Sequence, residues 1–177
     1  MALLNKGHKN SKEDNYFTPK WCWEDIKDLI PKDKVIWEAF PGNFQSGTAL
    51  QNLGFETINR DVDFFKNDLG DIIVSNPPFS KIPQILKRLK MIDKPFILIM
   101  PVGKITTQYF KKTFIKGRRR KTKLLETPHN IQIIVPRKRI NFDKLNEKGE
   151  VVKTKSASFD CFYYCWRMNL PNDINFV

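Results

Sequence analysis

The segment Asn76-Pro77-Pro78-Phe79 combines residue types that could hold a ligand in a fixed place, and it directly follows the apolar run at 72–74. Two prolines remove two backbone donors and stiffen the chain, and each one pushes the residue before it toward extended geometry. The segment therefore predicts a rigid corner at the end of a buried strand, presenting one amide side chain and one aromatic ring. Alone, it also fits a tight turn, because Asn-Pro and Pro-Pro are common turn signals.

Basic residues are concentrated in two stretches of a chain whose net charge is +12. Residues 104–123 contain nine Lys or Arg and no acid, and a second group follows at 136–139. Such a concentration is the usual footprint of a polyanion and predicts nucleic acid as partner, although a solvated face of a lysine-rich chain is the alternative. The predicted nucleic-acid-binding residues are Lys104, Lys111, Lys112, Lys116, Arg118, Arg119, Arg120, Lys121, Lys123, Arg137, Lys138 and Arg139.

Apolar periodicity predicts strands that alternate with helices. This alternation is typical of a three-layer α/β fold with a mostly parallel sheet, in which ligands bind beyond the carboxyl ends of the strands. The segment 38–42, Asp61 and Asn76 each lie at the end of a predicted strand, so we expect them to converge on one crevice. Strands are predicted at 34–40, 55–60, 71–75, 95–100, 131–135 and 158–166, helices at 21–30, 81–92, 106–115 and before Gly54, and a hairpin insert at 136–156.

The length of 177 residues indicates one domain at 16–177 with a flexible N-terminal arm at 1–15. No apolar run approaches the ~18 residues of a membrane span, and the start lacks the apolar stretch of a signal peptide. We therefore expect a soluble intracellular protein without a membrane partner. The three cysteines show no zinc spacing, no metal site is predicted, and core packing is expected for Cys22, Cys161 and Cys165.

Several motifs together resemble the S-adenosylmethionine-dependent DNA N6-adenine methyltransferases, in particular small phage- or virus-type members. "NPPF" at 76–79 matches the family's (D/N/S)PP(Y/F/W) catalytic motif, and "EAFPGN" at 38–43 is similar to the cofactor loop after the first strand. "YFTPKW" at 16–21 is similar to the motif that precedes that strand, and the likeness extends over about 14–168. The resemblance implies a Rossmann-like class I methyltransferase fold with an antiparallel closing strand.

The resemblance also implies roles for the corner residues. The side-chain oxygen of Asn76 and the carbonyl of Pro77 accept hydrogen bonds from the adenine amine, Pro78 keeps the corner rigid, and Phe79 stacks on the base, which leaves the duplex to reach the site. Cofactor contacts are implied for Phe17, Thr18, Pro19, Glu38, Phe40, Gly42, Asp61, Asp63, Phe64 and Asn76.

Among these cofactor residues, Glu38 resembles the acid that positions the amino-acid part, and Asp61 the acid that binds the ribose hydroxyls. Asp63 and Phe64 resemble the pair that reads the adenine. Other interpretations stay open. Glu38 could be a solvated carboxylate, either aspartate a turn residue, and Thr18 with Pro19 a helix cap.

The chain departs from the family in three places. Phe44 stands where the family usually has a second glycine, and 61–71 is too short for the usual helix and strand, so one edge strand should be missing. No target-recognition domain is apparent, so we expect weak sequence specificity, or a homo- or hetero-oligomer that supplies it. DNA is preferred as substrate from the family likeness. RNA adenine methylation, N4-cytosine methylation, protein glutamine methylation and an inactive nucleic-acid-binding subunit remain alternatives.

Overall fold

The computed structural model describes residues 16–114, 131–145, 150–153 and 159–177. Within them, a seven-stranded sheet has the strand order β2-β1-β3-β4-β8-β5-β9. The predicted arm at 1–15 lies outside the described residues. The strands of this sheet are β1 (Ile36–Trp37), β2 (Thr57–Ile58), β3 (Ile72–Ser75), β4 (Phe96–Pro101), β5 (Ile131–Val135), β8 (Cys161–Trp166) and β9 (Ile174–Phe176).

The sheet is mixed but mostly parallel, as the sequence predicts. β1 pairs in parallel with β2 and with β3, and β3 pairs in parallel with β4. β8 runs antiparallel to both of its neighbours and lies between β4 and β5, inside the sheet. β9, which was not predicted from the sequence, pairs in parallel with β5.

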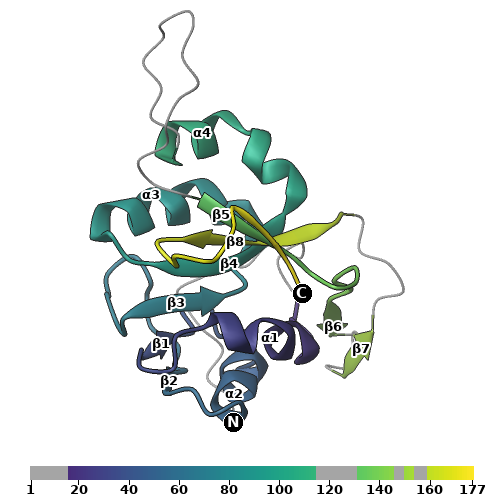
Figure 1. Ribbon diagram of the computed structural model, residues 1–177. Helices are drawn as coiled ribbons and strands as arrows, with labels where there is room; N and C mark the ends of the chain where they lie inside the picture. Colours follow the sequence, from purple (N-terminus) through teal and green to yellow (C-terminus); the bar gives the residue numbers. More distant parts are fainter. Residues whose placement is uncertain (1–15, 115–130, 146–149, 154–158) are drawn as a thin grey trace, which may run out of the picture.

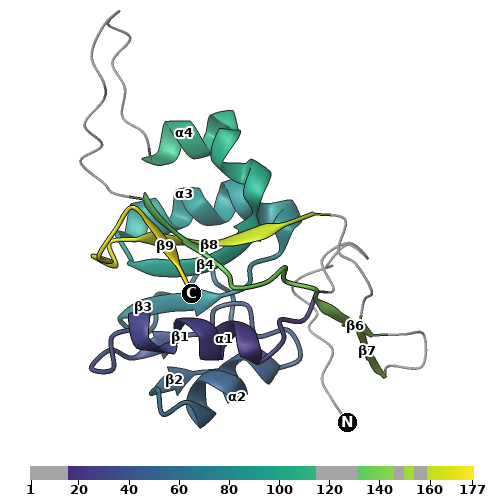
Figure 2. The same cartoon turned by 45° about the vertical axis from the view of Figure 1, so that its right-hand side comes forward.

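Two helices cover each face of the sheet, which confirms the three-layer α/β arrangement (Figures 1 and 2). α1 (Trp21–Ile26) and α2 (Gln45–Asn52) lie on one face, and α3 (Ile82–Ile92) and α4 (Gln108–Phe114) lie on the other. Short 3-10 turns occur at η2 (Lys27–Leu29), η3 (Phe79–Lys81) and η4 (Val102–Thr106). None of the helices in the described part of the chain has the length and apolar character of a bilayer-spanning segment.

The core lies in two layers because successive strand residues point to opposite faces. Val74 packs with α1 and α2, whereas its neighbour Ile73 packs with α3 and α4. β4 is buried on both faces over its first five residues, as expected for an all-apolar central strand. The predicted core positions are confirmed for the apolar side of α3 and for the three free cysteines, namely Ile82, Ile85, Leu86, Leu89, Cys22, Cys161 and Cys165.

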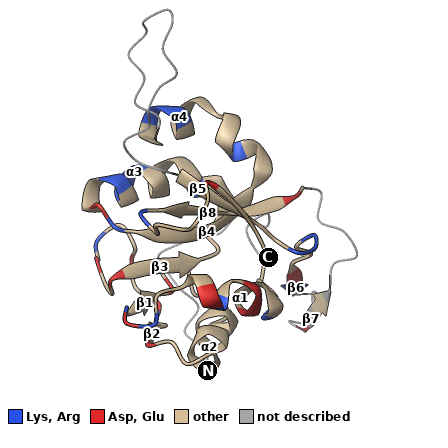
Figure 3. Ribbon diagram, in the orientation of Figure 1, with Lys and Arg blue, Asp and Glu red and all other residues tan. Residues whose placement is uncertain are grey.

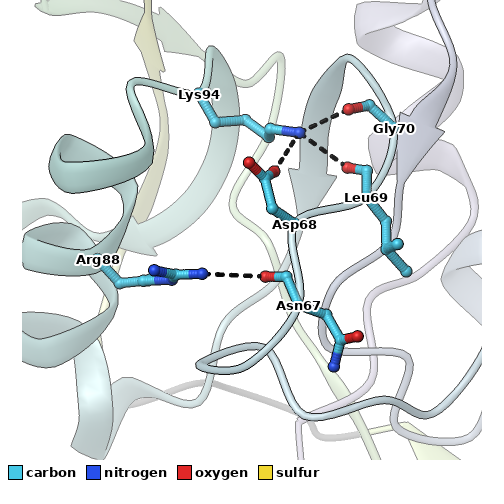
Figure 4. Close-up of polar contacts among 6 residues, drawn as sticks. All are labelled: Asn67, Asp68, Leu69, Gly70, Arg88 and Lys94. Atoms are coloured by element: carbon cyan, nitrogen blue, oxygen red, sulfur yellow. Dashed lines mark hydrogen bonds and ion pairs between the residues drawn. The ribbon is translucent and has the colours of Figure 1, made fainter.

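The connection from β2 to β3, residues 59–71, contains no helix or strand, so the sheet ends at β2, as the sequence predicts. Its C-terminal part is fastened by Lys94, which is nearly buried before β4. The ammonium group donates to the carbonyls of Leu69 (3.0 Å) and Gly70 (2.6 Å) and pairs with the carboxylate of Asp68 (Figure 4). These contacts hold the connection against the residue that precedes β4.

The predicted insert contains a small antiparallel hairpin, formed by β6 (Asp143–Leu145) and β7 (Val151–Lys153). The connecting residues 146–149 lie outside the described residues. Phe17 and Asp143 exchange two backbone hydrogen bonds of 2.9 Å each. The insert is therefore joined to the segment that precedes α1 (Figure 2).

Candidate active site

Three neighbouring parallel strands end at the same edge of the sheet and bring three predicted site positions there. Glu38 follows β1, Asn76 follows β3, and Asp61 lies three positions after β2. The ends of β1 and β3 touch, because the hydroxyl of Ser75, next to Asn76, donates a hydrogen bond to Oε1 of Glu38. The topology thus places a carboxylic acid and an amide side by side at adjacent strand ends.

Glu38 is fully buried, so it is not a solvated carboxylate. Its Oε1 also accepts the backbone N–H of Phe40 at 3.1 Å, whereas Oε2 is buried with no hydrogen-bond partner among the described residues. Burial raises the pKa of Glu38 to about 7, although the hydrogen bonds from Ser75 and Phe40 oppose part of this rise. The group is therefore an acid that changes charge near neutral pH and has one oxygen available for a donor.

The amide of Asn76 is held in one orientation. Its Nδ2 donates to the backbone carbonyl of Tyr16 at 3.1 Å, and a carbonyl can accept only from the NH₂ end of an amide. Oδ1 is consequently directed elsewhere, and it is buried with no partner among the described residues. An unpaired buried acceptor costs about 1–3 kcal/mol, so this oxygen is a position that a ligand donor could satisfy.

Phe79 belongs to a cluster of four aromatic rings beside this amide. Tyr16 stacks on Phe79 with a centroid distance of 5.9 Å and an interplanar angle of 25°. Phe142 and Phe159 meet Phe79 edge to face at 6.0 Å and 5.4 Å. Sequence reasoning identified only Phe79. Tyr16 stands directly before the predicted "FTP" segment, but nothing in the sequence pairs it with Phe142 or Phe159.

The turn after β1 uses two left-handed residues. Gly42 has φ +54° and Phe44 has φ +66°, in the region that glycine favours and that costs other residues roughly 1–2 kcal/mol. Phe44 stands where a second glycine was expected, so the residue differs while the backbone conformation is the one glycine would adopt. A Cβ on Gly42 would lie 3.5 Å from the ring of Phe17, which shows that the segment before α1 packs on this turn.

A pocket of about 520 Å³ adjoins the same turn, between α1, α2 and β6. Thr18 and Pro19 are the predicted cofactor residues that line it, together with Asn43 and Phe44 of the turn. The hydroxyl of Thr18 is buried without a partner among the described residues, and α1 has no side-chain cap, so Thr18 does not cap the helix. The other predicted cofactor residues lie outside the lining of this pocket.

The remaining predicted cofactor residues lie after β2 and do not form one exposed group. Asp61 is exposed. Asp63 makes the contacts of a turn residue, since its carboxylate accepts the N–H of Phe65 at 2.9 Å and lies 3.7 Å from the ammonium of Lys66. Phe64 is buried in the core against Phe40, with a centroid distance of 4.9 Å.

The predicted nucleic-acid-binding residues that the structure describes fall into two groups, one in η4 and α4 and one at 137–139; Figure 3 shows them among the other basic residues. Lys104 lies in η4, and Lys111 and Lys112 lie on α4. The second group is the turn after β5, where Arg137 pairs with Asp25 and Arg139 with Asp160, each at 2.9 Å. The other predicted nucleic-acid-binding residues, Lys116, Arg118, Arg119, Arg120, Lys121 and Lys123, lie outside the described residues.

Comparisons of the chain with models of protein families, with curated proteins and with solved structures gave no match.

Proposed function

We propose that the chain is an S-adenosylmethionine-dependent methyltransferase that acts on the exocyclic N6 amine of adenine in nucleic acid, with DNA preferred. The observation that carries the proposal is the state of Asn76. Its NH₂ group is occupied by the carbonyl of Tyr16, and its buried oxygen has no partner among the described residues. A hydrogen-bond acceptor held ready beside an aromatic ring is what an amine on a planar base requires.

The chemistry follows from the weakness of the nucleophile. The lone pair of an exocyclic adenine amine is delocalised into the ring, so the nitrogen attacks poorly. Oδ1 of Asn76 and the carbonyl of Pro77 would accept hydrogen bonds from its two N–H groups and draw the nitrogen toward tetrahedral geometry, which localises the lone pair for the new N–C bond. The bond between the methyl group and its donor sulfur would break as this bond forms, and the nitrogen would then release one proton to water. Positioning of this kind supplies most of the rate enhancement, and an oxygen dipole facing the developing positive charge adds to it.

S-adenosylmethionine, when bound, supplies a methyl group on a positively charged sulfur. The chain offers groups that fit such a ligand at the end of β1. Oε2 of Glu38 and Oγ1 of Thr18 are buried polar atoms without partners among the described residues, suited to an ammonium group and to the polar part of an amino acid. Gly42 and Phe44, both with positive φ, shape the turn after β1. Asp61 is the candidate for the ribose hydroxyls, because two carboxylate oxygens suit a diol.

The strand order supports a Rossmann-like class I methyltransferase fold. β1 is flanked by β2 and β3, and the one reversed strand of the seven described, β8, lies between β4 and β5. In this interpretation the sheet lacks the edge strand that would follow β2. We further propose that the enzyme is intracellular and that its sequence specificity is low or comes from a second copy or another subunit.

The proposal is tested by incubating the protein with radiolabelled S-adenosylmethionine and, separately, DNA, RNA and protein. We expect label in nucleic acid, and Asn76→Ala should reduce transfer by about 10²–10³-fold, the range for loss of one oriented polar group. Thermal unfolding should show that the variant is folded. Full activity of Asn76→Ala would overturn the mechanism, and label in protein alone would favour glutamine methylation.

A further inference from the structure

We propose that Tyr16, Trp21, Lys138 and Lys144 form a surface that binds the phosphodiester backbone of the strand that carries the target base. We call this set the ring–lysine surface. The identity of its partner rests on the proposed function, whereas its position and charge come from the contacts of the four residues.

Each lysine of the ring–lysine surface is seated on an aromatic ring. Nζ of Lys138 lies 4.6 Å from the ring centroid of Trp21, and Nζ of Lys144 lies 4.5 Å from that of Tyr16. A ring face attracts a cation without neutralising it. The two ammonium groups are therefore held in place and keep their full charge toward an external anion.

The acids that form ion pairs near this surface pair with arginines, and Lys138 acts on Asp25 only from beyond ion-pair distance. Asp25 pairs with Arg137, which also lies over Trp21 at 5.6 Å, and Asp160 pairs with Arg139. Within the described part of the chain, no carboxylate lies in ion-pair distance of Lys138 or Lys144. The two arginines thus attach the turn after β5 to Asp25 and Asp160. The two lysines remain as the cations that can bind phosphates. Figure 3 shows this basic turn close to α1 and β6.

The ring–lysine surface begins at the catalytic corner. The backbone carbonyl of Tyr16 holds the amide of Asn76, and the Tyr16 ring stacks on Phe79. The backbone pairing of Phe17 with Asp143 brings the next residue, Lys144, onto the Tyr16 ring. A strand that places a base against Phe79 would therefore pass Lys144 first, and could continue toward Trp21 and Lys138.

The chemistry of the surface favours a nucleic acid over other anions. Lysines supply point charges for phosphates, and the rings of Tyr16 and Trp21 hold these two charges in place. A membrane-binding surface would instead project large apolar side chains, whereas Tyr16 and Trp21 are packed against the core.

The test compares two double variants of equal net charge. Lys138→Ala/Lys144→Ala removes the proposed contacts. Lys32→Ala/Lys87→Ala is the control, because both lysines are exposed and lie in the turn before β1 and on α3. Binding of a fluorescently labelled adenine-containing oligonucleotide, as DNA and as RNA, is measured over a range of salt concentrations. K is the association constant, and log K falls as log salt rises. The first variant should make this slope less steep by about 1.4–1.8, or 0.7–0.9 per lost phosphate contact. The control should keep the wild-type slope.

Tryptophan fluorescence gives a second readout, because Trp23, Trp37 and Trp166 are fully buried and Trp21 is partly exposed. The oligonucleotide should change the emission of the wild type and leave that of Trp21→Phe unchanged.

Equal slopes for the two double variants would overturn the inference, as would lysine-dependent binding to phosphatidylserine vesicles without binding to oligonucleotides. Binding through these lysines without any methyl transfer would sustain this inference and overturn the proposed function. Methyl transfer by the wild type, with a salt slope that Lys138→Ala/Lys144→Ala leaves unchanged, would sustain the proposed function and overturn this inference.

Discussion

Glu38 is a buried acid whose pKa the fold raises into the neutral range. Its pKa in the folded protein is about 7, because the carboxyl group is buried, against 4.5 for an ordinary glutamate. The folded state therefore keeps its proton at a pH where the unfolded chain has released it. The free energy of unfolding should fall as pH rises from about 5 to about 7, by up to roughly 3 kcal/mol.

Glu38→Gln should remove this pH dependence, because the amide does not titrate. Chemical denaturation at several pH values measures it, with Glu56→Gln at an exposed site as the matched control. The same pH profile for Glu38→Gln and the wild type would show that another group is responsible.

Phe44 carries the backbone strain of the turn after β1. Its φ of +66° suits glycine, and its side chain is 43% exposed. Phe44→Ala and Phe44→Gly both delete the ring, so the difference between them isolates the backbone. The glycine variant should be more stable than the alanine variant by about 1 kcal/mol, as measured by urea unfolding. An alanine variant as stable as the glycine variant would contradict the left-handed conformation.

Most helices and strands follow from local pattern, and the exceptions have physical causes. α3 was predictable because four apolar residues recur at helical spacing, and β4 because an uninterrupted apolar run fits a strand buried on both faces. β1 and β2 have only two residues each, although longer runs were predicted, because they end where the chain turns into the site. β9 was missed because three residues with alternating exposure carry no period. Its pairing depends on β5.

The C-terminal part of the connection between β2 and β3 is held by the ammonium group of Lys94, which bonds two carbonyls and one carboxylate in it (Figure 4). Lys94→Met keeps the length of the side chain and removes all three interactions. It should lower the free energy of unfolding by about 2 kcal/mol, because two partly buried carbonyls lose a charged donor. It should also speed amide exchange in 62–70. Lys87→Met, at an exposed position of α3, is the control, and equal stability of the two variants would contradict this role.

Across the whole molecule, the strand ends and the segment 76–79 could be predicted from the sequence, but the residues that pack around them could not. Asn76 and Glu38 were predictable because they directly follow apolar strands. The partners that orient the amide and build the ring cluster, Tyr16, Phe142 and Phe159, come from opposite ends of the chain. The pairing of Phe17 with Asp143 helps to bring those ends together, and local pattern cannot reveal a contact of this sequence separation.

The central claim is that the fixed amide of Asn76 activates an adenine amine for methylation. Mass spectrometry of nucleosides, after the protein has reacted with S-adenosylmethionine and DNA, identifies the methylated base directly. We predict N6-methyladenine from the wild type and about 10²–10³-fold less from Asn76→Ala. N4-methylcytosine, or no methylated base under conditions in which the protein is folded and binds the DNA, would contradict the claim.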